Sequence, residues 1–185
     1  PYDSSDWRKY VLSTRAHNTI MVDGCEQHRR DRPRQEYVIE KPMPIKWASN
    51  GRFDYANSSY DNGYASDNSI KVRHERSVFF VKPVRSASAL LSEAGAVAPP
   101  GYWIVVDRMN PADLKSHKYE SAFHLDTQGA EVDSTTKAVR TTDTKGANLT
   151  IFPMADDGLK VRIVTGQKEP IVQGCMPVPG YDCRP

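Results

Sequence analysis

The sequence predicts an all-β protein, an antiparallel β-sandwich, and three observations support this prediction. Short runs rich in β-branched and aromatic residues recur along the chain and are separated by turn residues. Helical periodicity is almost absent, so the crossover helices that parallel strands require are missing. About ten strands in one domain of this length should pack in layers, which favours a sandwich.

The first strands are marked by clear turn signals. Residues 19–22 form an apolar run that ends at Asp23-Gly24. Residues 45–48 and 52–56 flank Asn50-Gly51, a dipeptide typical of tight hairpins, so we expect the two runs to pair.

The later strands follow the same pattern, with apolar or alternating runs between polar turns. A run at 36–40 precedes two prolines, which should end its pairing or place it at an edge. The remaining expected strands are 70–76, 78–81, 103–108, 119–125, 138–141, 149–152, 159–164 and 171–172.

One segment departs from the strand pattern. Residues 86–94 favour a short helix, which Gly95 and Pro99-Pro100 would end. This segment lies between two apolar strands, so we expect a helical or irregular insertion near residues 86–98, at the edge of a sheet.

Composition and motifs exclude several classes of protein. The formal net charge of +2 at pH 7 gives no support for nucleic-acid binding. No apolar run approaches the roughly 20 residues that a membrane-spanning helix needs. HExxH, GxSxG, GxGxxG and Walker patterns are all absent from the sequence.

The ends of the chain look cut. There is no initiator Met or signal-peptide pattern at the start, and the chain stops at Cys183-Arg184-Pro185. We therefore expect residues 1–185 to be a single domain from a longer protein.

The three cysteines leave their pairing open. A disulfide between Cys175 and Cys183 fits the proline- and glycine-containing loop between them, but free thiols fit as well. Cys25 stands alone, and an odd number of cysteines leaves one free or bonded to another chain. No CxxC pair is present, so a cysteine zinc site is not expected.

The segment before the first strand contains the richest set of chemical groups. Arg15 can grip a carboxylate with two hydrogen bonds, and Asn18 can donate a hydrogen bond that neutralises one. His17 can ligate zinc through a ring nitrogen. The structural alternative is that His17 and Asn18 satisfy backbone groups where the strand begins.

Two further segments suit either a binding surface or a plain exposed loop. Residues 28–34 are strongly basic and offer an edge for a polyanion. Residues 57–68 are polar and rich in tyrosine. His124 is expected to be a hydrogen-bonded strand histidine rather than a ligand.

Several stretches of the sequence also resemble a known protein family. Residues 6–24, DWRKYVLSTRAHNTIMVDG, resemble the opening of the C-terminal β-domain of heparinase II/III-like polysaccharide lyases, which include heparinases and alginate and oligo-alginate lyases. Residues 73–81, 103–108 and 119–126 fit the same order along the chain.

The resemblance implies a two-domain parent enzyme. Such enzymes have an N-terminal α/α toroid followed by a β-sandwich, with the active site between them, and this chain resembles the sandwich alone. The resemblance implies that His17 is a zinc ligand, whose partner His and Asp lie upstream in the family. It makes Tyr2 the nearest match to a catalytic tyrosine, whereas Cys25 falls where the family often has a polar residue.

The implied chemistry is β-elimination on a glycan that contains uronic acid. The substrate carboxylate is neutralised, a base removes the C5 proton, and an acid protonates the leaving glycosidic oxygen. This chain would offer Tyr2 as a catalytic residue, Arg15 and Asn18 for substrate binding, and His17 for zinc. The Asn, His and Tyr of the toroid are absent, so the chain alone should be inactive.

The resemblance also implies partners and location. The expected partners are an acidic polysaccharide or oligosaccharide and the protein's own toroid domain, with zinc in the full-length parent and a periplasmic or secreted location. Two alternatives remain. In one, the chain is a non-catalytic carbohydrate-binding or structural module that uses residues 29–34 and the tyrosine-rich loop. In the other, the parent has lost its activity and keeps only the fold.

Overall fold

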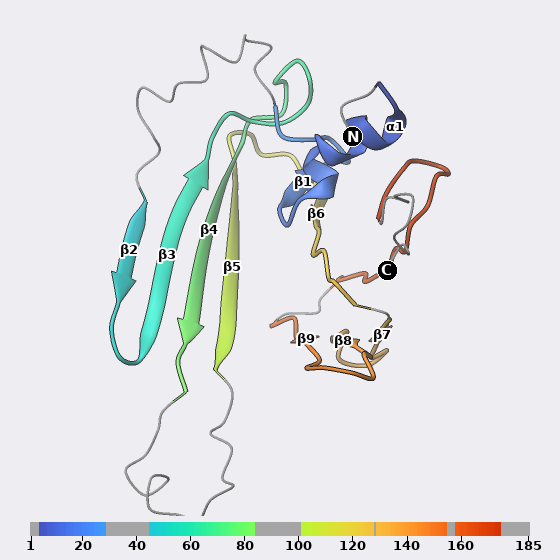
Figure 1. Cartoon of the computed structure of the whole chain (residues 1–185). Coiled ribbons are helices and arrows are strands. Elements are labelled where there is room, and N and C mark those ends of the chain that lie inside the picture. The colour runs from blue at the N-terminus through green and yellow to red at the C-terminus, as the bar shows by residue number, and fades with distance from the viewer. Residues whose placement is uncertain (1–3, 29–44, 84–100, 128, 155–157, 175–185) are drawn as a thin grey trace, which may run out of the picture. The chain divides into compact units, whose positions relative to one another are not determined.

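The computed structural model describes residues 4–28, 45–83, 101–127, 129–154 and 158–174 (Figure 1). Several expectations fall outside these ranges. They are the role of Tyr2, the strand at 36–40, the basic segment 29–34, the insertion near 86–98 and the bridge between Cys175 and Cys183.

The described residues have the expected all-β, sandwich-like fold. They form three sheets, and the pairings in the two larger sheets are antiparallel. The helical part of the described ranges is limited to α1 (Asp6–Val11) and the 3-10 helix η1 (Thr14–Ala16). Neither piece has the length and apolar character of a membrane span.

The strands fall into two compact units, Val22–Tyr119 and Pro1–Met21 with Glu120–Pro185. The assignment of the whole chain to one domain stays a prediction. The strands are β1 (Ile20–Val22), β2 (Lys46–Ser49), β3 (Phe53–Tyr60), β4 (Val72–Val81), β5 (Tyr102–Pro111), β6 (Tyr119–Ser121), β7 (Ala130–Val132), β8 (Val139–Thr141) and β9 (Thr150–Ile151).

The unit Val22–Tyr119 is built on a four-stranded sheet in the order β2-β3-β4-β5 (Figure 1). The predicted hairpin at Asn50-Gly51 is confirmed as β2–β3. The side-chain oxygen of Asn50 accepts the backbone N–H groups of Arg52 at 2.8 Å and Phe53 at 3.0 Å, which fixes the turn. The expected runs 70–76 and 78–81 join into one long strand, β4.

The core of this unit lies at one end of the sheet. Val22, Tyr64 and Val72 are almost fully buried there. Tyr60 lies edge-on to Tyr64 with their ring centroids 5.9 Å apart. The expectation of an exposed tyrosine-rich loop at 57–68 is therefore wrong, because β3 extends through Tyr60 and Tyr64 packs inward.

The other unit contains the sheet β7-β8-β9 and the helical N-terminal segment. The side chain of Ser5 caps α1 by accepting the N–H of Arg8 at 3.2 Å, and Asp6 places a negative charge in the first turn. Local capping thus forms a six-residue helix where sequence periodicity gave no signal. Tyr10 is buried, and its hydroxyl accepts the N–H of Gly174 at 3.0 Å.

Some expected strands do not form. Residues 159–164 and 171–172 have a strand-like composition but are not in a strand. Near the second of these, the pairing is a single bridge between Gln167 and Gln173. The strand expected at 119–125 shortens to β6 (Tyr119–Ser121), which pairs with β1.

Candidate functional site

His17 lies where η1 ends and the backbone becomes extended before β1, with φ −130° and ψ 155°. Its side chain is exposed, and Nδ1 lies 2.7 Å from the carbonyl oxygen of Ser13. A carbonyl only accepts hydrogen bonds, so Nδ1 must carry the proton and donate it. The lone pair of a neutral His17 is then on Nε2, which is the tautomer that a histidine ligand uses when its other nitrogen bonds to a carbonyl.

Asn18 and His124 fix the segment after β6 to the N-terminal segment. Oδ1 of Asn18 accepts the N–H of His124 at 2.6 Å. Nε2 of His124 in turn donates to the carbonyl oxygen of Arg15 at 3.0 Å. His124 is hydrogen-bonded, as expected, but it lies beyond the end of β6.

Glu120 links two arginines that are far apart in the sequence. Its Oε1 accepts from Nη1 of Arg15 at 3.2 Å and from Nη2 of Arg162 at 2.9 Å. Among the described residues, Glu120 is the only carboxylate that these two guanidinium groups contact, so one of their two positive charges stays uncompensated there. The side chain of Arg162 is 61% exposed against 15% for Arg15, so the accessible charge is on Arg162.

These groups form one polar surface, which we call the Arg15–His17 surface. Its members contact one another directly or are neighbours in the sequence. Three of the residues predicted from the sequence are among them. It consists of Arg15, His17, Asn18, Glu120, His124 and Arg162.

The Arg15–His17 surface does not make a complete zinc site. Within the described ranges, no three His, Cys, Asp or Glu side chains gather closely enough to hold a metal ion. A structural zinc site needs four ligands and a catalytic one three protein ligands. His17 is oriented as a single ligand would be, and the described residues do not supply the others.

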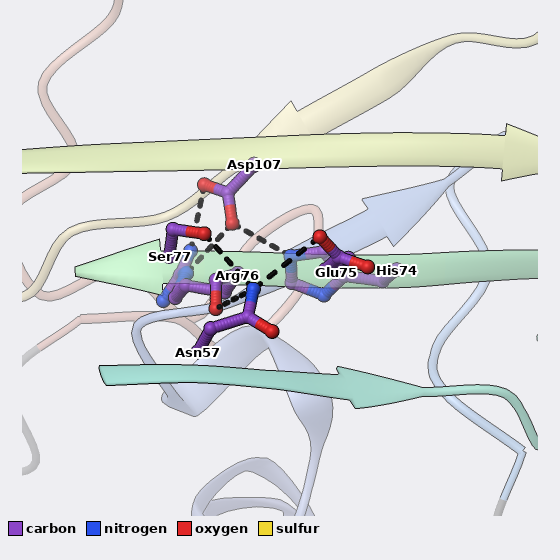
Figure 2. Close-up of polar contacts among 6 residues, drawn as sticks. All are labelled: Asn57, His74, Glu75, Arg76, Ser77 and Asp107. Carbon is purple, nitrogen blue, oxygen red and sulfur yellow. Dashed lines mark hydrogen bonds and ion pairs between the residues drawn. The ribbon is translucent and has the colours of Figure 1, made fainter. Parts of the chain in front are cut away.

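A second polar cluster lies on β4 and β5, centred on Asp107 (Figure 2). Arg76 pairs directly with Asp107 across the ladder, and its Nε and Nη2 donate to the two carboxylate oxygens at 2.7 and 3.0 Å. His74, two residues along β4 and on the same face, places Nε2 2.6 Å from Oδ1 of Asp107.

The charge of Asp107 follows from two opposed effects. Burial raises the pKa of this carboxyl, but the hydrogen bonds and positive charge of His74 and Arg76 outweigh it, so the pKa is lowered. Asp107 is therefore ionised near neutral pH. Because His74 is buried, this cluster is suited to holding β4 against β5 rather than to touching a polysaccharide.

The opposite face of the sheet carries a separate hydrogen-bonded group. Asn57 is buried, and its Nδ2 donates to Oγ of Ser77 at 2.9 Å and to Oε1 of Glu75 at 3.3 Å (Figure 2). Asn57 and Ser77 are direct partners in the β3–β4 register. This group supports pairing of β3 with β4.

Tyr64 packs against the same end of the sheet and is fully buried. Burial raises the pKa of its hydroxyl to about 12, and the side chain of Gln27 lowers it only in part. The negative charge of Asp107 raises this pKa further, and Arg76 lowers it. Tyr64 therefore stays protonated at neutral pH and is not a base in this arrangement.

The fold and the Arg15–His17 surface define a β-domain that presents arginine and histidine side chains just before its first strand. Residues 1–175 match the family described as Heparinase II/III-like, C-terminal. The chain therefore belongs to this family, as the resemblance of residues 6–24 predicted. Comparisons with curated proteins and with solved structures found no match.

Sequence reasoning missed several members of both groups. Glu120, Arg162 and Asp107 gave no local signal, because their partners come from other strands or from distant segments. His74 and Arg76 could have been found from the two-residue spacing that places them on one face of a strand.

Proposed function

We propose that this chain is the C-terminal domain of a polysaccharide lyase that cleaves uronic-acid-containing glycans by β-elimination. The observation that carries the proposal is its membership in the heparinase II/III-like C-terminal family over residues 1–175. The Arg15–His17 surface supports it, because the exposed guanidinium group of Arg162 suits a substrate that carries carboxylates.

The reaction requires three events at one sugar. A base removes the proton from C5, the electron pair forms the C4–C5 double bond, and the C4–O bond breaks as an acid protonates the leaving oxygen. The C5 proton becomes acidic only when the neighbouring carboxylate is neutralised. In this proposal the domain supplies one wall of the cleft and the N-terminal toroid supplies the rest, so the chain alone is inactive.

Arg162 and Arg15 are the residues we assign to carboxylate neutralisation. Arg162 meets the uronate directly because it is the more exposed of the two, and Glu120 holds Arg15 in place. Asn18 and Tyr2 complete the proposed set, Asn18 as a second substrate contact and Tyr2 as the catalytic tyrosine of this domain.

Binding by this chain tests the carboxylate assignment. Titration of alginate and heparin oligosaccharides by calorimetry should show weak, salt-sensitive binding that Arg162→Gln reduces several-fold. Lys160→Gln is the matched control, since it removes another exposed cation two residues away and should leave binding nearly unchanged. Equal losses in the two variants would contradict a specific role for Arg162.

A metal measurement tests the proposed role of His17. In the full-length parent, we propose that His17 supplies one zinc ligand and that the others come from outside the described residues. Zinc, when bound, would supply a fixed positive charge. Metal analysis of the longer protein should find zinc that His17→Ala removes and His124→Ala keeps. Zinc retained in His17→Ala would contradict the assignment.

A lyase assay tests the function itself. The gene with its native upstream region is expressed, and the product is incubated with heparin, heparan sulfate, alginate and other uronate glycans. The ultraviolet absorbance of the new C4–C5 double bond should rise with one of them and not with the 185-residue chain alone. No rise with any glycan would contradict the proposed lyase function and would leave only the fold and the family membership established. We also propose a periplasmic or secreted location, which fractionation of the source cells would test.

A further inference from the structure

The loop after β5 contains an imidazole held between two carboxylates. Nδ1 of His117 lies 2.6 Å from Oδ2 of Asp23, and Nε2 lies 2.9 Å from Oδ1 of Asp113. The side chain of His117 is only 7% exposed, whereas those of Asp23 and Asp113 are 36% and 44% exposed. Asp23 and His117 are 94 residues apart in the sequence, so the cluster joins two distant segments.

The geometry fixes the charge of His117. An ionised carboxylate only accepts hydrogen bonds, so each ring nitrogen that faces one must donate. Both nitrogens of His117 face carboxylates, and the imidazole must therefore carry two protons and a positive charge in this arrangement. A neutral His117 has one donor and would leave one carboxylate facing a lone pair.

Backbone groups support the two carboxylates. Oδ1 of Asp23 accepts the N–H of Lys118 at 2.7 Å, and the N–H of Asp23 donates to the carbonyl oxygen of Lys118 at 2.8 Å. Oδ1 of Asp113 accepts the N–H of Lys115 at 3.2 Å. These backbone contacts hold both carboxylates toward the ring of His117, where they favour its charged form.

Among the described residues, Lys115, Lys118 and Tyr119 are the other charged or titratable groups that contact the cluster or act on it. The positive charge of Lys115 acts on Asp113 and helps to keep it ionised. The rings of His117 and Tyr119 lie 6.3 Å apart between centroids. Burial and the two carboxylates raise the pKa of Tyr119, so it stays neutral while His117 titrates.

All three residues of the cluster belong to the unit Val22–Tyr119 and lie close in sequence to its two ends. The chain enters the unit Val22–Tyr119 one residue before Asp23 and leaves it two residues after His117. β1 and β6, the strands at these two passages, pair with each other. The cluster therefore ties together the segments next to this strand pair.

We propose that His117, Asp23 and Asp113 form a pH-sensitive latch that holds the turn after β1 to the loop after β5 and opens when His117 loses its proton. The latch would operate whether or not the parent protein is a lyase. The loop after β5 would thus change its conformation with the protonation of a single residue, His117.

The direction of the pH dependence follows from the hydrogen bonds. Asp23 and Asp113 raise the pKa of His117, so the latch is fully closed below the ordinary histidine pKa and is lost as pH rises through the raised one. His117 lowers the pKa of both carboxyls, so on the acid side the latch is lost as pH falls through their lowered values. The latch is closed between these limits.

Amide hydrogen exchange on the 185-residue chain tests the latch. The protection factor of the Lys118 amide should fall several-fold as the pH is raised through the titration of the His117 ring, followed by NMR on the same sample. The amide of Ala122, which donates to the carbonyl of Thr19 at 3.1 Å, is the internal control and should keep its protection. Constant protection of Lys118 through the titration would overturn the proposal.

Three variants make the test specific. His117→Gln should lower the protection of Lys118 at neutral pH and abolish its pH dependence. His124→Gln, which removes an imidazole that bonds to the backbone carbonyl of Arg15 and not to a carboxylate of the cluster, should keep that dependence. If His117→Gln fails to fold, Asp113→Asn keeps the imidazole and should lower the pKa of His117 in an NMR titration. An unchanged His117 titration in Asp113→Asn would overturn the proposal.

Discussion

Arg76 binds Asp107 with two parallel hydrogen bonds, Nε to Oδ1 at 2.7 Å and Nη2 to Oδ2 at 3.0 Å, directly across the β4–β5 ladder. Their side chains are only 23% and 18% exposed. A bidentate pair of this kind fixes geometry as well as charge. The pair therefore sets how β4 and β5 align within the four-stranded sheet.

Removal of Arg76 should destabilise the protein much more than removal of an exposed arginine nearby. Arg76→Gln leaves the Asp107 carboxylate without its main partner and should cost about 2 kcal/mol of unfolding free energy. Arg108→Gln, the control on the next strand, breaks only an exposed contact 3.7 Å from Glu75 and should cost less than about 0.5 kcal/mol. Urea unfolding of both variants measures the difference, and equal costs would contradict the role assigned to Arg76.

Asp107 should also contribute to the acid sensitivity of the fold. Its pKa is lowered in the folded state, so its stabilisation is present above the ordinary aspartate pKa and is lost as pH falls through the lowered value. Asp107→Asn should therefore reduce the loss of stability between neutral and acid pH. The exposed Asp126→Asn is the control. Parallel pH profiles for wild type and Asp107→Asn would contradict this prediction.

Gly101, just before β5, should not tolerate a side chain. A Cβ there would lie 2.6 Å from the carbonyl oxygen of Val81 and 2.7 Å from the ring of Phe80. Since the backbone would have to shift, Gly101→Ala should cost about 1–3 kcal/mol of stability. Gly51→Ala meets nothing within 4 Å and is the matched control, expected to be neutral or slightly stabilising. Thermal unfolding of the two variants decides between these outcomes.

The side-chain oxygen of Asn18 should stabilise the segment that follows β6 by accepting the N–H of His124. Asn18→Ala removes the acceptor for the N–H of His124 and should cost about 1 kcal/mol, with faster amide exchange at His124. Asn18→Asp keeps an oxygen in the same place and should preserve the protection of that amide. If the two variants exchange equally fast at His124, the hydrogen bond is not what holds this segment.

The sequence predicted the fold where local signals agree. The hairpin at Asn50-Gly51 has the turn residue that the structure uses, and the long apolar runs became β4 and β5. Residues 159–164 show the limit of this reasoning, because a strand also needs a partner and composition says nothing of one. α1 was missed because a single capping serine, Ser5, started a helix too short to show periodicity.

The candidate site was predicted only in part, because some of its residues are adjacent in the sequence and others meet only in the fold. Arg15, His17 and Asn18 are adjacent in the sequence, so their pattern could be read directly. Glu120 and Arg162 join them only through the fold. Asp113 and His117 are only four residues apart but match no recognised motif, and Asp23 joins them only through the fold.

The most direct test of the central claim compares two forms of each glycan. The full-length protein is incubated with each of several uronate glycans and with the same glycans after their carboxyl groups have been reduced to alcohols. Elimination needs the carboxylate to make the C5 proton acidic, so absorbance of the C4–C5 double bond should rise only with the intact glycan. A family member acting as proposed gives that result. Absence of the unsaturated product from every intact uronate glycan would contradict the lyase assignment.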